Sequence, residues 1–323
     1  GSATANLSGV LISDCWSDKA ITYQNDGGAI YMRDNAKVTM KNCVIRNCRA
    51  VDYGGAIYME TDGNRLTCEN VDIISCTADE NQGGGVYQDY GETTWIGGSI
   101  KNCHTGDDDG GGFYVNNDKV FMQNVLFDGN SAHDNGGAFC SDSDDGAWFI
   151  GCTFQRNNAE DLGGAVYVDN DNIYMEDCTV VSNSSGDEGG GIYIAGSSTI
   201  GVAGVVVIRS SDGTGSHDNL VLGNNAYIYN HGLQPGSEIR LRSDSDGSVK
   251  LGGGLMSEYQ LNQYFRADYG KLELTETQTV NTELRASVFS EGNTALIIGA
   301  LLLIAVLAGG VIYYRKKRKG GAQ

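Results

Sequence analysis

The stretch from Ile45 to Tyr58, IRNCRAVDYGGAIY, decides the fold, because both of its blocks recur along the chain. The second block is a glycine pair followed by a small residue, an apolar residue and usually a tyrosine. It begins at Gly27, Gly54, Gly83, Gly110, Gly136, Gly163 and Gly189. The steps between these glycines are 26 to 29 residues. A period this regular indicates stacked supersecondary units, so we expect a repeat protein.

The first block places an apolar residue ahead of each glycine pair, within a short alternating run that is typical of a strand. A second strand starts inside the glycine block, and a weaker third one follows it, as at Val38 to Met40. Three short strands per repeat, separated by Gly, Asn and Asp, predict an all-β fold, a parallel β-helix over residues 1–255. A helical alternative fails because glycine costs about 1 kcal/mol per residue in a helix interior.

In a parallel β-helix, equivalent residues stack into ladders. We expect one apolar ladder of Ile12, Ile45, Ile73, Ile100, Phe127, Phe154 and Val180. We expect a second of Ile30, Ile57, Val86, Phe113, Phe139, Val166 and Ile192. Three residues after the first ladder stand Cys15, Cys48, Cys76, Cys103, Asn130, Asn157 and Asn183. Buried thiols and stacked amides can share this slot, which favours a structural role for the cysteines, although disulfides between neighbouring coils remain an alternative.

The two blocks, read as GGA plus an aliphatic residue and as FxxN, are intact at Gly27 and Gly54 and at Phe127 and Phe154. They resemble the paired repeats of the polymorphic outer-membrane-protein family. The resemblance implies a right-handed β-helix that serves surface display and adhesion. The chain differs from that family where early repeats have IxxC, and in its C-terminal part, which carries one apolar segment in place of an autotransporter barrel.

The apolar segment, residues 295–314, has twenty residues without a charge and is followed by Arg315, Lys316, Lys317, Arg318 and Lys319. As a helix it is about 30 Å long, enough to cross a bilayer, and the basic flank favours the cytoplasmic side. We therefore expect a single-pass protein of the cell membrane with its N-terminal part extracellular. A cap at 256–275, a linker at 276–294 and a cytoplasmic tail at 315–323 complete the expected organisation.

Tyrosine ends the glycine block in all repeats but the one with Cys140, and we expect an aromatic column of Tyr31, Tyr58, Tyr87, Tyr114, Tyr167 and Tyr193. An Ala or Gly stands two residues before each tyrosine, and alternation along a strand places the two on the same face. A face with such small residues allows the tyrosines to point outward. An exposed aromatic stripe would suit sugar stacking or protein contact. Packing of each ring against the next is the interpretation that we favour.

Acidic residues gather just before each glycine pair, so stacking brings like charges into a column. Solvated turns tolerate this, because two charges about 5 Å apart in water repel by only about 0.8 kcal/mol. The alternative is weak calcium binding, as in loose extracellular sites. Its candidate ligands are Asp107, Asp109, Asp134, Asp161 and Asp187. No other cofactor is expected, since the four histidines are scattered and no CxxC pair occurs.

The net charge of −19 argues against binding to nucleic acid. We expect a surface adhesin or recognition module without catalytic activity, whose partner is a glycan or protein on another cell. The rival hypothesis is a carbohydrate-active enzyme, a polysaccharide lyase or glycoside hydrolase on a pectin lyase-like β-helix. Such a site needs a walled groove with convergent carboxylates and Arg or Lys, whereas the loops here are short, as at Thr61 to Gly63.

Overall fold

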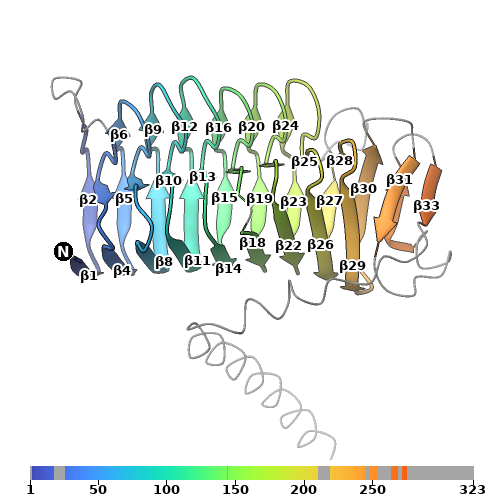
Figure 1. Ribbon diagram of the computed structural model, residues 1–323, viewed down its shortest axis with the longest axis horizontal. Coiled ribbons are helices and arrows are strands. Elements are labelled where there is room, and N and C mark those ends of the chain that lie inside the picture. The colour runs from blue at the N-terminus through green and yellow to red at the C-terminus, as the bar shows by residue number, and fades with distance from the viewer. Residues whose placement is uncertain are drawn as a thin grey trace, which may run out of the picture. The chain divides into compact units, whose positions relative to one another are not determined.

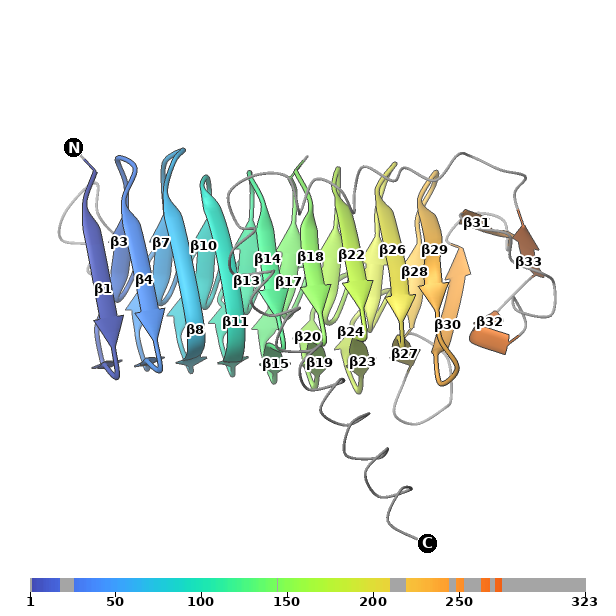
Figure 2. The same ribbon diagram turned by 90° about the horizontal axis from the view of Figure 1, so that it is seen from below.

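The chain forms a parallel β-helix whose coils lie side by side along one axis (Figure 1). The computed structural model describes residues 2–17, 26–143, 145–209, 219–243, 248–252, 263–267 and 271–274. Every strand pair in this part of the chain is parallel, as a β-helix requires. The view in Figure 2 shows successive coils with their strands in the same direction.

The strands of successive coils form three faces, and two-residue strands form a fourth row at one corner. The first face holds β3 (Ile30–Met32), β7 (Ile57–Met59), β10 (Val86–Gln88), β13 (Phe113–Val115), β17 (Phe139–Ser141), β21 (Val166–Val168), β25 (Ile192–Ile194) and β28 (Leu220–Leu222). The second face holds β1 (Thr4–Ser8), β4 (Lys37–Lys41), β8 (Arg65–Ile74), β11 (Glu92–Lys101), β14 (Val120–Gln123), β18 (Ala147–Ile150), β22 (Asn172–Glu176), β26 (Thr199–Gly204), β29 (Tyr227–Leu233), β31 (Ser248–Gly252) and β33 (Lys271–Leu274).

The third face holds β2 (Leu11–Ser13), β5 (Val44–Arg46), the second halves of β8 and β11, β15 (Leu126–Asp128), β19 (Thr153–Gln155), β23 (Thr179–Val181) and β27 (Val207–Arg209). The corner row holds β6 (Arg49–Ala50), β9 (Thr77–Ala78), β12 (His104–Thr105), β16 (Ser131–Ala132), β20 (Asn158–Ala159) and β24 (Ser184–Ser185). Strand β30 (Glu238–Ser243) pairs with both β27 and β28, and β32 (Phe265–Ala267) pairs with β30. The parts of the predicted cap that the structure describes, 263–267 and 271–274, thus extend the parallel pairing.

Both predicted apolar ladders are confirmed by the strand register. Ile45 pairs with Ile73 and Ile73 with Ile100, and these side chains are fully buried. Ile57 pairs in the same way with Val86 on the first face. The ladders continue past the regular repeats, through Ile208 and Ile239 on the third face and through Leu220 and Leu241 on the first. A single apolar core therefore follows the axis through the described coils.

The glycine pair is required by two separate constraints at one corner. Gly54 has φ of +65°, a conformation that residues with a Cβ rarely adopt. Gly55 has an ordinary φ, but a Cβ there would overlap the carbonyl oxygen of Gly84 in the next coil. The pair therefore lets the chain turn and lets adjacent coils approach closely.

The expectation that the Ala or Gly of this block shares a face with the tyrosine is wrong. Ala56 and Ile57 are consecutive, yet both are fully buried in the core. Their amides donate to the same carbonyl oxygen, that of Gly85, at 2.9 and 3.1 Å. This shared acceptor bends the chain, so two successive side chains point inward and Tyr58 points away from the core.

The predicted asparagine and cysteine slot is an interior ladder. Nδ2 of Asn130 donates to Oδ1 of Asn157 at 3.0 Å, and Nδ2 of Asn157 donates to Oδ1 of Asn183 at 2.9 Å. Each Oδ1 also accepts the backbone amide of the preceding coil's asparagine. In the other coils a free thiol fills the slot, and Cys103 donates to the carbonyl of Lys101 at 3.4 Å. All nine cysteines are free, in agreement with the structural interpretation.

Among the residues that the structure describes, no helix is long and apolar enough to cross a bilayer. The predicted linker, transmembrane segment and basic tail lie outside the described residues.

We predict that Asn157→Ala lowers the free energy of unfolding by about 3 kcal/mol, because it leaves the buried amide of Asn130 and the buried carbonyl of Phe127 without their partner. Chemical denaturation of the full chain measures this loss. The control is Asn158→Ala at the exposed neighbour, which we expect to change stability by less than about 0.5 kcal/mol. Equal effects of the two substitutions would contradict the interior ladder.

Candidate functional site

The predicted tyrosine column lies on the outer side of the first face, where its rings pack against one another. Ring centroids are 5.4 Å apart for Tyr31 and Tyr58, 5.3 Å for Tyr58 and Tyr87, and 5.2 Å for Tyr87 and Tyr114. Tyr58, Tyr87 and Tyr114 are each 7% exposed, and together with Cys140 they form an apolar cluster separate from the core. Tyr167 and Tyr193 continue the column beyond Cys140 with a spacing of 5.9 Å.

Tyr53 joins the column, although the sequence analysis did not include it. It precedes the glycine pair, and its ring centroid lies 4.7 Å from that of Tyr87. The hydrogen bonds Gly27 N to Tyr53 O and Gly54 N to Gln82 O place Tyr53 in register with turn residues of neighbouring coils. The only feature of the sequence that indicates this is the aromatic side chain of Tyr53 directly before the glycine pair, outside the repeating block.

Stacking decides which atoms of the column a ligand can reach. A ring between two neighbours has both faces covered, so the middle of the column offers no face for a sugar ring. The hydroxyls of Tyr58, Tyr87 and Tyr114 donate no hydrogen bond within the described part of the chain, and they are not among its fully buried polar atoms without a partner. The column therefore presents phenol oxygens at its surface.

One row of polar side chains borders the column immediately after the first-face strands. Its members are Glu60, Asp89, Asn116, Asp142 and Asp169. The amide of each donates to a carbonyl of the preceding coil, for example Asp89 N to Met59 O at 2.9 Å and Asn116 N to Gln88 O at 2.8 Å, so the row keeps the coil register. Asn116 Nδ2 also donates to Asp89 Oδ1 at 2.8 Å. We call this row the post-strand row.

A second row, the turn row, lies just before the glycine pairs and contains Asp26, Tyr53, Gln82, Asp109, Asn135, Leu162 and Glu188. In three of these residues, Asp26, Asp109 and Asn135, a side-chain oxygen accepts the backbone amide of the equivalent residue in the next coil. Asp109 accepts from Asn135 N at 2.7 Å, and Asn135 accepts from Leu162 N at 3.1 Å. These residues therefore have a structural task that an amide performs as well as a carboxylate.

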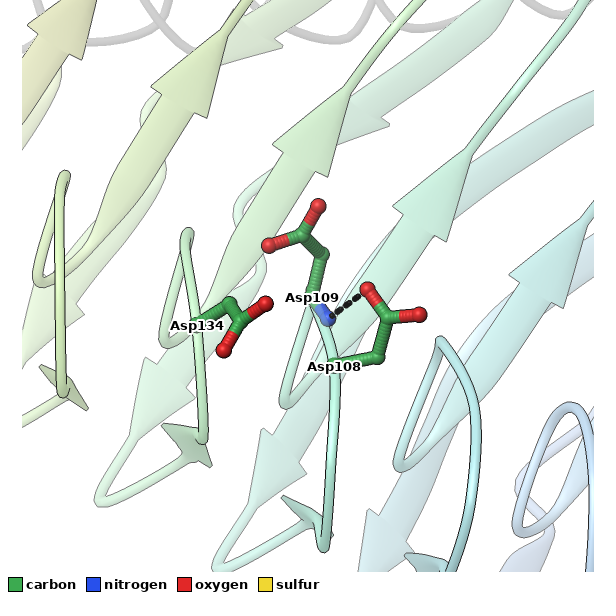
Figure 3. Close-up of side chains that lie close together, drawn as sticks. All are labelled: Asp108, Asp109 and Asp134. Carbon is green, nitrogen blue, oxygen red and sulfur yellow. Dashed lines mark hydrogen bonds between the residues drawn. The ribbon is translucent and has the colours of Figure 1, made fainter.

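Asp108, Asp109 and Asp134 form a carboxylate cluster on adjacent turns (Figure 3), each with one oxygen within 4.8 Å of those of the others. Of the predicted calcium candidates, the structure brings together Asp109 and Asp134. It adds Asp108 to them, while Asp107, Asp161 and Asp187 are not part of the cluster. Asp108 Oδ1 accepts from Asp109 N at 2.8 Å, and Asp134 Oδ1 lies 2.8 Å from His133 Nδ1. Hard oxygen ligands of this kind suit calcium, but protein donors already use part of their capacity.

Burial raises the pKa of several groups along the column. It raises the pKa of Asp26, Asp89 and Asp108, and it raises that of Asp109 to about 6. Burial also raises the pKa of Tyr87, and the charges of Asp89 and Asp108 add to this. The tyrosines and carboxylates therefore lie in one region of negative electrostatic potential.

A second aromatic row, which the sequence analysis also missed, lies on the outer side of the second face. Strand register aligns Phe121 with Trp148 and Trp148 with Tyr174. Indole Nε1 of Trp148 is buried without a hydrogen-bond partner in the described part of the chain, and Tyr174 donates to Glu176 at 3.1 Å. The signal in the sequence was an aromatic residue at the same position of the second-face strand in three successive coils, Phe121, Trp148 and Tyr174.

A hollow of about 810 Å³ lies beside the first coils, lined by Asp14, Cys15, Trp16, Ser17, Asn47, Arg49, Val51, Asp79 and Glu80. Its basic residue, Arg49, is bound to Asp79 at 2.6 Å. The hollow therefore combines one ion pair with the exposed Trp16.

Comparison with known proteins gives one match. The model of a family described as right handed beta helix region matches residues 55–240, more than half of the chain. No curated protein and no solved structure matches the chain significantly.

We predict that Asp109→Asn stabilises the protein above pH 6. Because the folded-state pKa of Asp109 is raised to about 6, the folded chain holds this proton more tightly than the unfolded chain. The wild type therefore gains stability as the pH falls through 6 towards the unfolded value near 3.8, and it carries a cost of about 2–3 kcal/mol at neutral pH. The asparagine removes this cost and still accepts the Asn135 amide, as Asn135 itself does for Leu162.

Denaturation from pH 4 to pH 8 measures the difference, which should vanish at the acid end. Asp107→Asn, at an exposed position of the same turn, is the matched control and should stay within about 0.5 kcal/mol of wild type. Parallel pH profiles of wild type and Asp109→Asn would contradict the prediction.

Proposed function

The chain belongs to the right-handed β-helix family, and from that premise we propose that it is a membrane-anchored surface-recognition module, an adhesin without chemistry of its own. The observation that carries the proposal is the tyrosine column with its two bordering rows, which continues over many coils with tyrosines on the face and mainly polar residues beside them. A surface built by repetition suits contact with an extended partner, since each coil adds a subsite at the same spacing. Small-molecule sites are instead concave and few in a protein.

The enzyme hypothesis is the alternative within the same family, because folds of this kind do not fix a function. Catalysis by a lyase or hydrolase needs positioned acid and base groups around one bond. The strongest candidate in the described residues is His133, which lies 2.8 Å from Asp134 and 3.8 Å from Glu160. All three side chains are at least 43% exposed at the turns, a setting more typical of a solvated ion pair than of a reaction centre.

Membrane anchoring is the second part of the proposal. The uncharged residues 295–314 and the basic cluster Arg315 to Lys319 support one span with the β-helix outside the cell. The repeat blocks shared with the polymorphic outer-membrane-protein family support the same use, surface display and adhesion.

We predict that the double substitution Leu302→Asp and Leu303→Asp prevents stable membrane insertion, because each central charge costs about 2.5–3.5 kcal/mol. Alkaline carbonate extraction of expressing cells measures it: the wild-type chain should stay in the pellet and the variant should move to the supernatant. Leu302→Ala with Leu303→Ala is the control and should pellet like wild type. Extraction of the wild-type chain by carbonate would contradict the anchor.

For the function itself, we predict that cells displaying the full chain gain adhesion to glycan- or protein-coated surfaces and release no products from polysaccharides. Retention under flow measures adhesion, and assays for reducing ends and for unsaturated uronates measure cleavage. Cells with the anchor-disrupted variant control for non-specific retention. Polysaccharide breakdown that rises with the amount of displayed protein would overturn the proposal in favour of the enzyme.

A further inference from the structure

Seven carboxylates around the tyrosine column have no basic partner among the described residues, whereas Glu188 at the end of the turn row is paired with Arg242 at 2.6 Å. The seven are Asp26, Glu60, Asp89, Asp108, Asp109, Asp142 and Asp169. On the second face of the β-helix, two acidic side chains have such a partner: Glu69 pairs with Lys41 at 2.6 Å and Glu92 with Arg65 at 2.9 Å. Most of the unpaired carboxylates are half-buried, so they have lost hydration without gaining a counter-charge. A bound cation would compensate this loss.

The tyrosine hydroxyls also favour a cationic ligand. Tyr58, Tyr87 and Tyr114 are more than nine-tenths buried, and their hydroxyls have no hydrogen-bond partner in the described part of the chain. Their rings are held by stacking, which fixes the hydroxyls, and each tyrosine lies along the chain between a turn-row residue and a residue of the post-strand row. Fixed acceptors next to unpaired carboxylates match a ligand that carries several donors and positive charge.

We infer that the tyrosine column and the unpaired carboxylates beside it bind an extended, lysine-rich segment of a partner protein, with ammonium groups seated between phenol oxygens and carboxylates. This inference rests on the proposed function, because it names the ligand class of the same recognition surface.

Lysine fits the geometry of this surface. An ammonium group has three donors, enough to bond a hydroxyl and a carboxylate at once. Its four-carbon stem can lie along the tyrosine edges and reach carboxylates that are half-buried behind the rim. The post-strand row from Glu60 to Asp169 extends over four coil steps, about 19 Å at about 4.8 Å per step, which equals about six residues of extended peptide.

The test uses the full chain in nanodiscs of zwitterionic lipid, with empty nanodiscs as blanks. The probe is a peptide of alternating lysine and glycine, and the control peptide carries Nε-acetyl-lysine, which keeps the stem and removes the charge. Calorimetry or fluorescence anisotropy measures the dissociation constants. We expect binding of the lysine peptide that weakens as salt is added, and no binding of the acetylated peptide.

Two double variants with the same change in net charge locate the site. Asp89→Asn with Asp142→Asn removes two of the four carboxylates of the post-strand row, where Asn116 shows that asparagine is accepted. Glu69→Gln with Glu92→Gln neutralises two carboxylates of the second face. We expect the first pair to weaken peptide binding about tenfold and the second to change it less than about twofold.

A third variant tests the hydroxyls: Tyr58→Phe, Tyr87→Phe and Tyr114→Phe together keep the rings and should weaken binding about threefold without loss of thermal stability. Equal weakening by the two charge-neutralising pairs would overturn the inference, because it would show attraction to net charge alone. Binding of calcium with no binding of the lysine peptide would also overturn it, in favour of a metal site at the Asp108 cluster.

Failure of this inference can be told apart from failure of the proposed function. If the Asp89→Asn, Asp142→Asn variant adheres to cells as wild type does, the lysine site is wrong and the adhesin proposal stands. If the peptide binds as expected but displayed protein cleaves polysaccharide, the site stands and the adhesin proposal is wrong.

Discussion

Backbone hydrogen bonds that run along the axis are the constraint on which the whole structure depends. Each coil donates to and accepts from the coils on either side of it, as Asp72 N does to Cys43 O and Thr77 N to Cys48 O. These bonds form only when equivalent residues lie above one another, so any insertion must be absorbed at a turn. The repeat of 26 to 29 residues is the consequence of this requirement.

Inside the coil, the same constraint turns each residue choice into a ladder. Apolar residues at Ile45 and its equivalents bury one another, and asparagines at Asn157 and its neighbours satisfy one another's amides. A polar slot in an apolar core is stable here because the next coil always supplies the partner. In other coils the slot holds a small thiol, and Cys76 and Cys103 each donate to the backbone carbonyl two residues earlier in the chain.

Outside the coil, stacking brings together groups that would otherwise stay apart. Tyrosines become a column that only Cys140 interrupts, and carboxylates such as Asp89 and Asp109 come to lie beside it. Packing of the rings stabilises the face, while the half-buried carboxylates carry an electrostatic cost that a cationic partner would offset. The surface proposed for recognition is thus a direct product of the repeat, and needs no cleft.

The sequence by itself determined the period, the strand positions and the core ladders, because regular spacing and stacked apolar residues leave one architecture. It also identified the asparagine slot at Asn130 to Asn183 and most members of the tyrosine column. Only the tertiary structure decided that Ala56 and Ile57 both face inward, that Tyr53 joins the column, and that Asp108 rather than Asp107 meets Asp134. Those outcomes depend on how the chain bends at the corners, where shared hydrogen-bond acceptors and left-handed residues override simple alternation, and spacing in a sequence does not encode that bend.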